Sequence, residues 1–320
     1  MKSSWVTAVK ARYLIPLVLI LLLFMLFAFF PFGSSANPVA IQKTMDGGHA
    51  FAFFLLSGLL YLVIEQRSKG WAVLISAILS VAMMVMVELL QPYVGRTASL
   101  ADFMIGLLGV IIALTGVVVW RHMNRWMLRV VHLVIAVVAV VWVVQPALDE
   151  WRALWLRGQQ FPLLGDFEDR LEKRLWKASG EVDGERTRIS FSEKHTVSGA
   201  SSLKIETVGG TWSGVSYAAG DQDWRDYRML VIEAYNPGDA FAINIRIDDG
   251  VKNFPQYGER YNGQWQINAG ANTLSIPLAK ISLEPRVRPL ELERIRKMIL
   301  FVGKGETPLE FYLDNVRLVP

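Results

Sequence analysis

Six polar side chains lie beside long apolar runs in the first third of the chain, where charge is otherwise rare. They are Asp46, His49, Glu88, Gln91, Arg96 and Asp102. Together, a guanidinium group, carboxylates and an imidazole could clamp a phosphorylated headgroup and move protons on it. The alternative interpretation is structural, because the same groups could be solvated helix ends in which Arg96 pairs with an acid.

A second set of polar side chains follows a strand pattern near residue 245. In the stretch "INIRIDD", alternate positions face opposite sides of a strand, so the polar residues share one face, and aromatic residues follow soon after. Planar hydrogen-bonding groups beside aromatic rings suit sugars, which present hydroxyls and an apolar face. The candidates are Asn244, Arg246, Asp248, Tyr257, Arg260, Tyr261, Asn262 and Trp265. The alternative is a solvated strand face with ordinary surface aromatics.

Composition divides the chain into an apolar N-terminal part and a polar C-terminal part. Of the 320 residues, 52% are hydrophobic, the mean hydropathy is +0.32, and the long apolar runs end near Gln145. A bilayer core of about 30 Å needs about 20 apolar residues of helix. We therefore expect the lipid bilayer as a partner and five spanning helices, over roughly 13–31, 49–65, 71–90, 101–120 and 128–145.

The Lys and Arg residues of the short loops predict the orientation of these helices. With the N-terminus in the cytoplasm, the inner loops carry Lys2, Lys10, Arg12, Arg67, Lys69, Arg121, Arg125 and Arg129. The opposite loops carry only Lys43 and Arg96. Five spans then place the C-terminal part outside a bacterial cytoplasmic membrane, in the periplasm or the extracellular space. The first segment is not expected to be a cleaved signal peptide, because its apolar run is longer than a usual signal core of about 7–15 residues.

On this topology all six polar residues of the first set lie at the outer ends of helices or in an outer loop. Glu88 and Gln91 are three residues apart and share a helix face. A stripe of small residues follows Asp102, which lets a neighbouring helix approach closely. The stripe consists of Gly106, Gly109, Ala113 and Gly116. We therefore expect Asp102 to face the helix bundle and not lipid.

These stretches resemble the VanZ-like family of small membrane proteins. The resemblance rests on "DGGHAF" and "ELLQPYVGRTASLADFMIGLLG" and covers about residues 10–145. The family pattern matches at His49, Glu88, Gln91, Arg96, Ser99 and Asp102. The family usually has an asparagine four residues after the aspartate, where this chain has Gly106. The resemblance implies a membrane fold but supplies no reaction.

From Asp166 onward, short runs alternate polar and apolar residues between turn residues. Eight or more such runs without a long helix predict an antiparallel sandwich or jelly roll. Residues 151–320 hold 23 basic and 23 acidic residues, so nucleic acid is not expected as a partner. The absence of cysteine excludes disulfides and thiolate sites. The sequence of this part has one histidine, His195, and no nucleophile or phosphate-loop motif, so enzyme chemistry is not expected there.

The strand runs resemble the galactose-binding-like jelly rolls, with family 11 carbohydrate-binding modules and the complex I intermediate-associated protein 30 group as the nearest members. The resemblance rests on "FPLLGDFED", "DWRDYRMLVIEAYNP", "INIRIDD" and "FYLDNVRL", among others, and covers nearly all of residues 165–320. It implies binding of a polysaccharide or other glycan. It also implies a structural Ca²⁺ ion, held by Asp166 or Glu168 and by Asp314 with carbonyls near Ser198 and Gly199, since calcium prefers oxygen ligands.

The predicted organisation is multi-domain: an α-helical transmembrane bundle of five helices, then an all-β antiparallel jelly-roll sandwich. The boundaries are 1–146 for the bundle, 147–164 for a juxtamembrane linker and 165–320 for the sandwich. In the linker, residues 147–157 are expected as either a short helix on the membrane surface or a helical spacer. The expected function is binding of envelope or extracellular glycan. The alternative is a membrane enzyme acting on a lipid-linked or phosphorylated headgroup, with transport as a weaker third interpretation.

Overall fold

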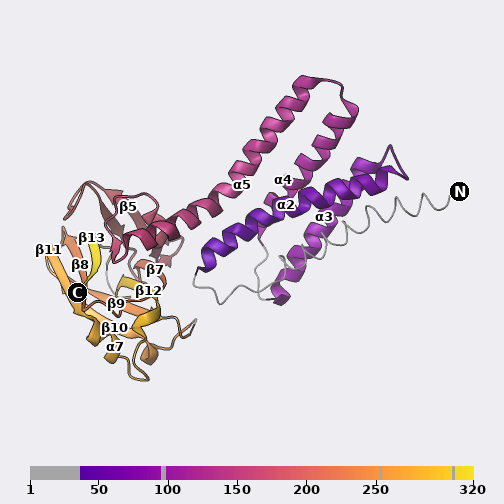
Figure 1. Cartoon of the computed structure of the whole chain (residues 1–320). Coiled ribbons are helices and arrows are strands. Elements are labelled where there is room, and N and C mark those ends of the chain that lie inside the picture. Colours follow the sequence, from indigo (N-terminus) through magenta and orange to yellow (C-terminus); the bar gives the residue numbers. More distant parts are fainter. Residues whose placement is uncertain (1–36, 95–98, 253, 305–306) are drawn as a thin grey trace. The chain divides into compact units, whose positions relative to one another are not determined.

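The computed structural model describes residues 37–94, 99–252, 254–304 and 307–320. The chain divides into two compact units, Met1–Leu148 and Asp149–Pro320 (Figure 1). The helices of the first part are α2 (Pro38–Glu65), α3 (Ala72–Leu90), η1 (Gln91–Val94), α4 (Leu100–Val117), η2 (Val118–His122) and α5 (Trp126–Gln160). Four helical stretches of the described residues are long and apolar enough to cross a membrane. The predicted first span, 13–31, lies outside the described residues.

Helices α2, α3 and α4 pack as an up-down-up bundle. An ion pair between Glu65 and Arg121 joins the C-terminal end of α2 to the end of α4 and η2, so these two helices run the same way. Helix α3 runs oppositely, and its Ser80 hydroxyl lies 2.9 Å from that of Ser57 in α2. The predicted small stripe meets α2 at Gly109, where an added methyl group would come within 2.1 Å of the Ala50 carbonyl oxygen, whereas Gly116 faces His132 of α5. A side chain in place of Gly109 would force α2 and α4 apart.

Helix α5 is longer than the sequence predicts. It passes through Pro146 and ends at Gln160, so the helix includes most of the segment predicted as a linker. Its last part belongs to the second unit, where Ala153 is fully buried in the sandwich core. Arg174 binds Asp149 at 2.8 Å and Glu150 at 3.0 Å. These contacts make the end of α5 an element of the sandwich unit.

The second unit is an antiparallel β-sandwich, as predicted. The six-stranded sheet has the order β11 (Gly270–Pro277), β8 (Met229–Asn236), β13 (Glu310–Val319), β6 (Ser202–Glu206) and β5 (Arg188–Ser192), with β1 (Leu163–Gly165) on β13. The five-stranded sheet has the order β10 (Tyr261–Ile267), β9 (Phe241–Asp249), β12 (Ile295–Val302), β7 (Gly214–Gln222) and β2 (Trp176–Ser179). The short elements are α6 (Glu172–Leu175), β3 (Glu181–Val182), β4 (Glu185–Arg186), η3 (Tyr257–Glu259), α7 (Leu278–Leu283) and η4 (Leu292–Arg294).

Alternation along the strands builds the core between the two sheets. In β9, Ile243, Ile245 and Ile247 point inward and are at most 1% exposed, while the residues between them point outward. Trp176 is fully buried in the same core, and its indole N–H donates to the Leu164 carbonyl at 3.0 Å. Each large apolar side chain contributes about 1.5–3 kcal/mol by leaving water. The inward face therefore stabilises the sandwich, and the outward face of the five-stranded sheet is available for other roles.

Candidate functional site

An open groove of about 730 Å³ lies on the outward face of the five-stranded sheet. All five strands or the loops beside them contribute to it. Its lining consists of Ser179, Trp212, Ser216, Asn244, Arg246, Tyr257, Arg260, Asn262, Gly263, Gln264, Lys297, Ile299 and Phe301. The groove is thus a mixture of aromatic rings, amides, hydroxyls and cationic groups.

Strand register places these side chains in rows across the sheet. Asn262 of β10 lies opposite Arg246 of β9, and Arg246 lies opposite Ile299 of β12. Ile299 in turn lies opposite Ser216 of β7. A second row consists of Gln264, Asn244, Phe301, Gly214 and Ser179. Directly opposite residues have Cβ atoms about 4.5–5.5 Å apart, so each row is a continuous surface.

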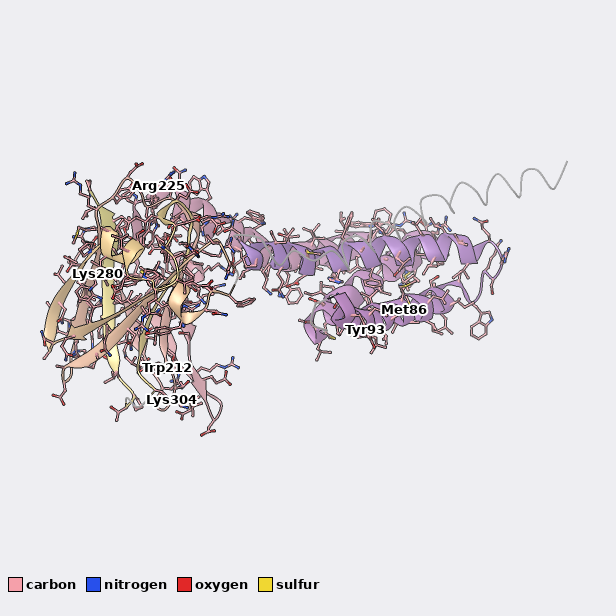
Figure 2. The ribbon with its side chains drawn as sticks, turned by 90° about the horizontal axis from the view of Figure 1, so that it is seen from below. Met86, Tyr93, Trp212, Arg225, Lys280 and Lys304 are labelled. Atoms are coloured by element: carbon pink, nitrogen blue, oxygen red, sulfur yellow. The ribbon has the colours of Figure 1, made fainter. Side chains whose placement is uncertain are left out.

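Aromatic rings border the groove. Trp212 lies in the loop before β7, is 57% exposed, and meets Phe301 edge to face with 5.7 Å between ring centroids. Its place on the surface of the sandwich is marked in Figure 2. Tyr257 is 64% exposed, and the Arg260 guanidinium lies 5.6 Å from the centre of its ring. Exposed rings on a polar face are what an apolar sugar face stacks on.

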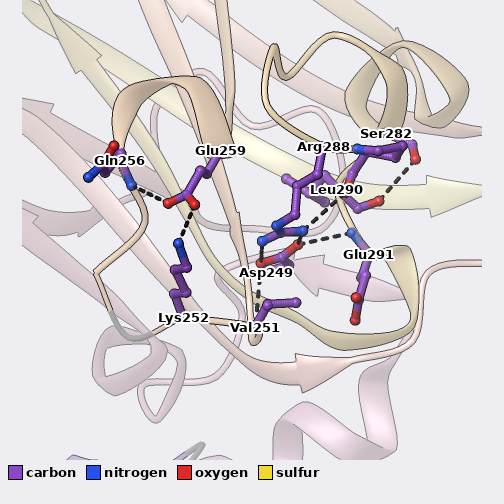
Figure 3. A network of polar contacts seen from close by, with 10 residues as sticks. Asp249, Val251, Lys252, Gln256, Glu259, Ser282, Arg288, Leu290 and Glu291 are labelled. Carbon is purple, nitrogen blue, oxygen red and sulfur yellow. Dashed lines mark hydrogen bonds and ion pairs between the residues drawn. The ribbon is translucent and has the colours of Figure 1, made fainter.

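A polar network holds the loop that carries Tyr257 (Figure 3). At the end of β9, Asp249 accepts two hydrogen bonds from the fork of Arg288, at 2.5 and 2.7 Å. Glu259 pairs with Lys252 and accepts from the Gln256 backbone N–H at 2.9 Å. The carboxylate of Asp249 therefore fixes the position of the start of the loop. Glu259 stabilises the turn that contains Tyr257.

The pKa of Asp249 lies below its ordinary value. Burial alone would raise this pKa, but the hydrogen bonds from Arg288 and the Glu291 backbone have the larger combined effect and lower it. Asn262 adds a further tie, because its side-chain N–H donates to the carbonyls of Tyr257 and Arg260 at 2.8 and 3.0 Å. The loop side of the groove is thus held in place by charge-assisted and amide hydrogen bonds.

Five of the eight residues predicted for sugar binding line this groove: Asn244, Arg246, Tyr257, Arg260 and Asn262. Asp248 is 6% exposed, and both of its carboxylate oxygens accept from Arg246, at 2.7 and 2.6 Å. Tyr261 is fully buried, and Trp265 is half-buried on the same inward side of β10, where Lys280 lies 5.3 Å from the centre of its ring. Alternation along β10 turns these two aromatic residues away from the groove.

The groove also contains residues that the sequence did not single out. They are Ser179, Trp212, Ser216, Gly263, Gln264, Lys297, Ile299 and Phe301. Strand β12 is mostly apolar by composition, which conceals that its alternate members, Lys297 among them, face outward. Within residues 261–265 of β10, the sequence predicts only binding candidates and not a strand. Its paired register with β9 is what brings Gln264 opposite Asn244.

Two of the three acids predicted to hold calcium flank one loop. Asp314 accepts from the Ser198 backbone N–H at 2.9 Å, and Glu168 accepts from the Ala200 and Ser201 N–H groups at 2.8 Å. Asp166 lies apart from this loop contact and accepts from the Glu168 N–H at 3.3 Å. Among the described residues, no three or more Asp, Glu, His or Cys side chains meet as a metal site. The donor set therefore fits a Ca²⁺ ion only if backbone carbonyls and water complete the shell of 6–8 oxygens.

Calcium stays a prediction, and a chelator tests it. Burial raises the pKa of Asp314, and the charge of Glu168 adds to this, so a bound cation would stabilise both carboxylates. We expect chelation to lower the melting temperature of the full chain in detergent, and Asp314→Asn to remove that sensitivity. An unchanged melt of the wild-type protein would mean that N–H donors alone hold the loop.

The polar residues of the helix bundle gather at one end of it. Gly106, Phe53 and Met84 form one contact layer among α4, α2 and α3. His49 in α2, Glu88 in α3 and Asp102 in α4 each lie one turn, about 5.4 Å, from this layer. Because α2 and α4 run in the same direction and α3 runs in the opposite one, all three lie toward the same end of the bundle.

Most of this cluster is buried. Asp46, His49, Gln91 and Asp102 are each at most 8% exposed. Asp46 pairs with Lys43 at 3.1 Å, and Glu88 accepts from the Ser99 N–H at 2.8 Å. Within the part of the chain that the structure describes, neither amide atom of the fully buried Gln91 has a hydrogen-bond partner. Arg96, the expected centre of the cluster, lies outside the described residues. A reaction at this end of the bundle stays a prediction.

No protein-family model matches the chain, and no curated protein matches it. Among solved structures, it is similar to a family 11 carbohydrate-binding module from Clostridium thermocellum in complex with a β-1,3-1,4-mixed-linked tetrasaccharide, at 21% identity and a TM-score of 0.41, over 49% of this chain and 94% of that one.

Two further structures are similar to the chain. The family 11 module of the cellulase Lic26A-Cel5E from the same organism matches at 19% identity and a TM-score of 0.39, over 49% and 92% of the two chains. A family 28 module specific for non-crystalline cellulose matches at 16% identity and a TM-score of 0.36, over 50% and 94%.

Proposed function

We propose that this protein is a membrane-anchored glycan-binding protein, which holds a polysaccharide of the cell envelope or its surroundings in the groove of its sandwich. The observation that carries the proposal is the groove itself, where the exposed rings of Trp212 and Tyr257 flank rows of amide and hydroxyl groups. Rings stack on the apolar face of a sugar, and amides take its hydroxyls. Four helices of the described residues are long and apolar enough to supply the anchor.

Loss of the Trp212 ring tests this function. We expect Trp212→Ala to weaken glycan binding by at least about tenfold, because loss of an aromatic contact that dominates binding costs about 2 kcal/mol or more and about 1.4 kcal/mol is a tenfold change. The measurement is affinity electrophoresis of the full chain in detergent against a panel of soluble polysaccharides. Trp155→Ala is the matched control, since Trp155 is 67% exposed on α5, outside the groove lining. Equal binding by both variants would contradict the role of the groove.

The proposed function needs the sandwich outside the cytoplasm, and the cysteine-free chain allows a direct test. Single cysteines replace Glu185, in the exposed β4 strand, and Asn124, in the connection between η2 and α5. We expect an impermeant maleimide to label Glu185→Cys in intact cells and to leave Asn124→Cys unlabelled, because the basic loops predict a cytoplasmic N-terminus. The reverse pattern would remove the extracytoplasmic role.

A further inference from the structure

Among the described residues, the groove lining contains three cationic side chains and no carboxylate. The cations are Arg246, Arg260 and Lys297. Beside these cations lies Asp248, which is in β9 opposite Lys297 of β12 and two residues from Arg246 on the same face. Three positive charges and one negative charge leave this cluster with a net charge of +2.

Asp248 does not balance all three cations. Both of its oxygens already accept from the Arg246 fork, at 2.7 and 2.6 Å. Among the described residues, Arg260 and Lys297 take part in no ion pair, and the buried Nε of Arg260 has no hydrogen-bond partner. These two cationic groups therefore lie in the groove with hydrogen-bonding capacity left over.

Electrostatics agrees with this geometry. Desolvation lowers the pKa of Lys297, and the charge of Arg246 lowers it further, while Asp248 opposes the shift. Desolvation also lowers the pKa of Arg260, with Arg246 again acting in the same direction. Like charges brought together disfavour their ionised forms, and an opposite charge within about 4–6 Å favours them. An anion bound in the groove would therefore stabilise both groups.

We propose that the groove selects acidic polysaccharides, with a negatively charged substituent of the sugar held between Arg260 and Lys297. This inference rests on the proposed glycan binding and adds the class of glycan. The guanidinium fork suits the paired oxygens of a carboxylate or a sulfate, and the lysine adds a point charge. The aromatic rings at the groove borders take the neutral sugar faces, so charge and stacking act on different parts of the same chain.

The test compares polymers that differ only in charge. Polygalacturonate, alginate and hyaluronate are each tested beside their carboxyl-reduced forms, against the full chain in detergent. We expect the acidic member of at least one pair to bind roughly five- to tenfold more tightly, as two partly exposed ion pairs would give. The preference should shrink in molar salt, where the Debye length falls to about 3 Å. A sulfated galactan beside its desulfated form distinguishes a sulfate from a carboxylate as the preferred charge, and a preference for either acidic form supports the proposal.

Variants locate the selectivity. Arg260→Gln and Lys297→Gln should each reduce the ratio of acidic to neutral binding, and Arg186→Gln should leave it unchanged, since Arg186 is exposed and pairs with Glu181 in the β3–β4 ribbon. Equal binding of the acidic and the uncharged form in every pair that binds would overturn this inference and leave glycan binding standing. Binding of no polymer in any pair would overturn both. Equal binding to polyglutamate would show that charge without sugar suffices and would also overturn it.

Discussion

Replacing Asp249 by alanine is expected to destabilise the sandwich by about 3–5 kcal/mol, the usual effect of removing one partner of a buried ion pair. Asp249 is 1% exposed, and its carboxylate takes both arms of Arg288 together with the Glu291 backbone N–H at 3.0 Å. Alanine leaves the guanidinium group without its partner and frees the start of the loop that carries Tyr257. We therefore expect glycan binding to fall along with stability.

The measurement is the urea midpoint of the full chain in detergent, read from the survival of the sandwich in a brief proteolytic pulse. Asp223→Ala is the matched control, because Asp223 also faces an arginine fork, that of Arg225, but on the exposed surface. Its midpoint should hardly change, since solvent screens exposed pairs. A loss of stability no larger for Asp249→Ala than for Asp223→Ala would contradict the role assigned to the network.

The stability of the sandwich should fall as pH rises from about 4.5 to about 8, and Glu172 is the main cause. Burial raises the pKa of this fully buried carboxyl to about 8 from its ordinary 4.5, and the neighbouring Asp166 adds to the shift. Between these values the folded state holds a proton that the unfolded state releases, so stability declines by about 1.4 kcal/mol per pH unit for one such group. Below about 4.5 the contribution is fully present, and above about 8 the loss is complete.

Glu172→Gln should remove most of this slope and stabilise the sandwich above pH 8. The glutamine stays neutral, and its amide offers an oxygen to the Phe167 or Gln160 donors and an N–H to Asp166. Burial also raises the pKa of Asp314, so Asp314 contributes a slope in the same direction, and the variant retains that slope. Proteolytic midpoints at pH 5, 7 and 9 measure the effect. A wild-type midpoint that rises with pH over this window would contradict it.

The sequence predicted the helices and the sandwich because composition and alternation report directly on burial. The β9 pattern is the clearest case, since isoleucine at every second position assigns Asn244 and Arg246 to the outward face. The end of α5 could not be predicted in the same way. Pro146 and the acids after it are typical of a linker. Asp149 and Glu150 pair with Arg174, which is far away in the sequence, and this contact is visible only in the folded structure.

The rest of the groove depends on contacts between distant segments. Phe301 and Lys297 lie in a run that is apolar by composition, so only the pairing of β12 with β9 and β7 reveals which of its residues face outward. Trp212 lies in a loop whose course depends on Gly214, where an added methyl group would come within 2.0 Å of the Leu300 carbonyl oxygen. Local pattern cannot report such a close approach between neighbouring strands.

The width of the groove has a consequence for attachment. It crosses five strands, four spacings of about 4.8 Å or roughly 19 Å, whereas a polysaccharide repeats its sugars over a far greater length. Under the proposed function, copies confined to one membrane would engage the same polymer, and each bound copy would raise the effective concentration of the polymer for the next. A modest affinity at one groove then becomes avidity. Retention of polymer should rise steeply with the number of copies per unit area, and short oligosaccharides should release it.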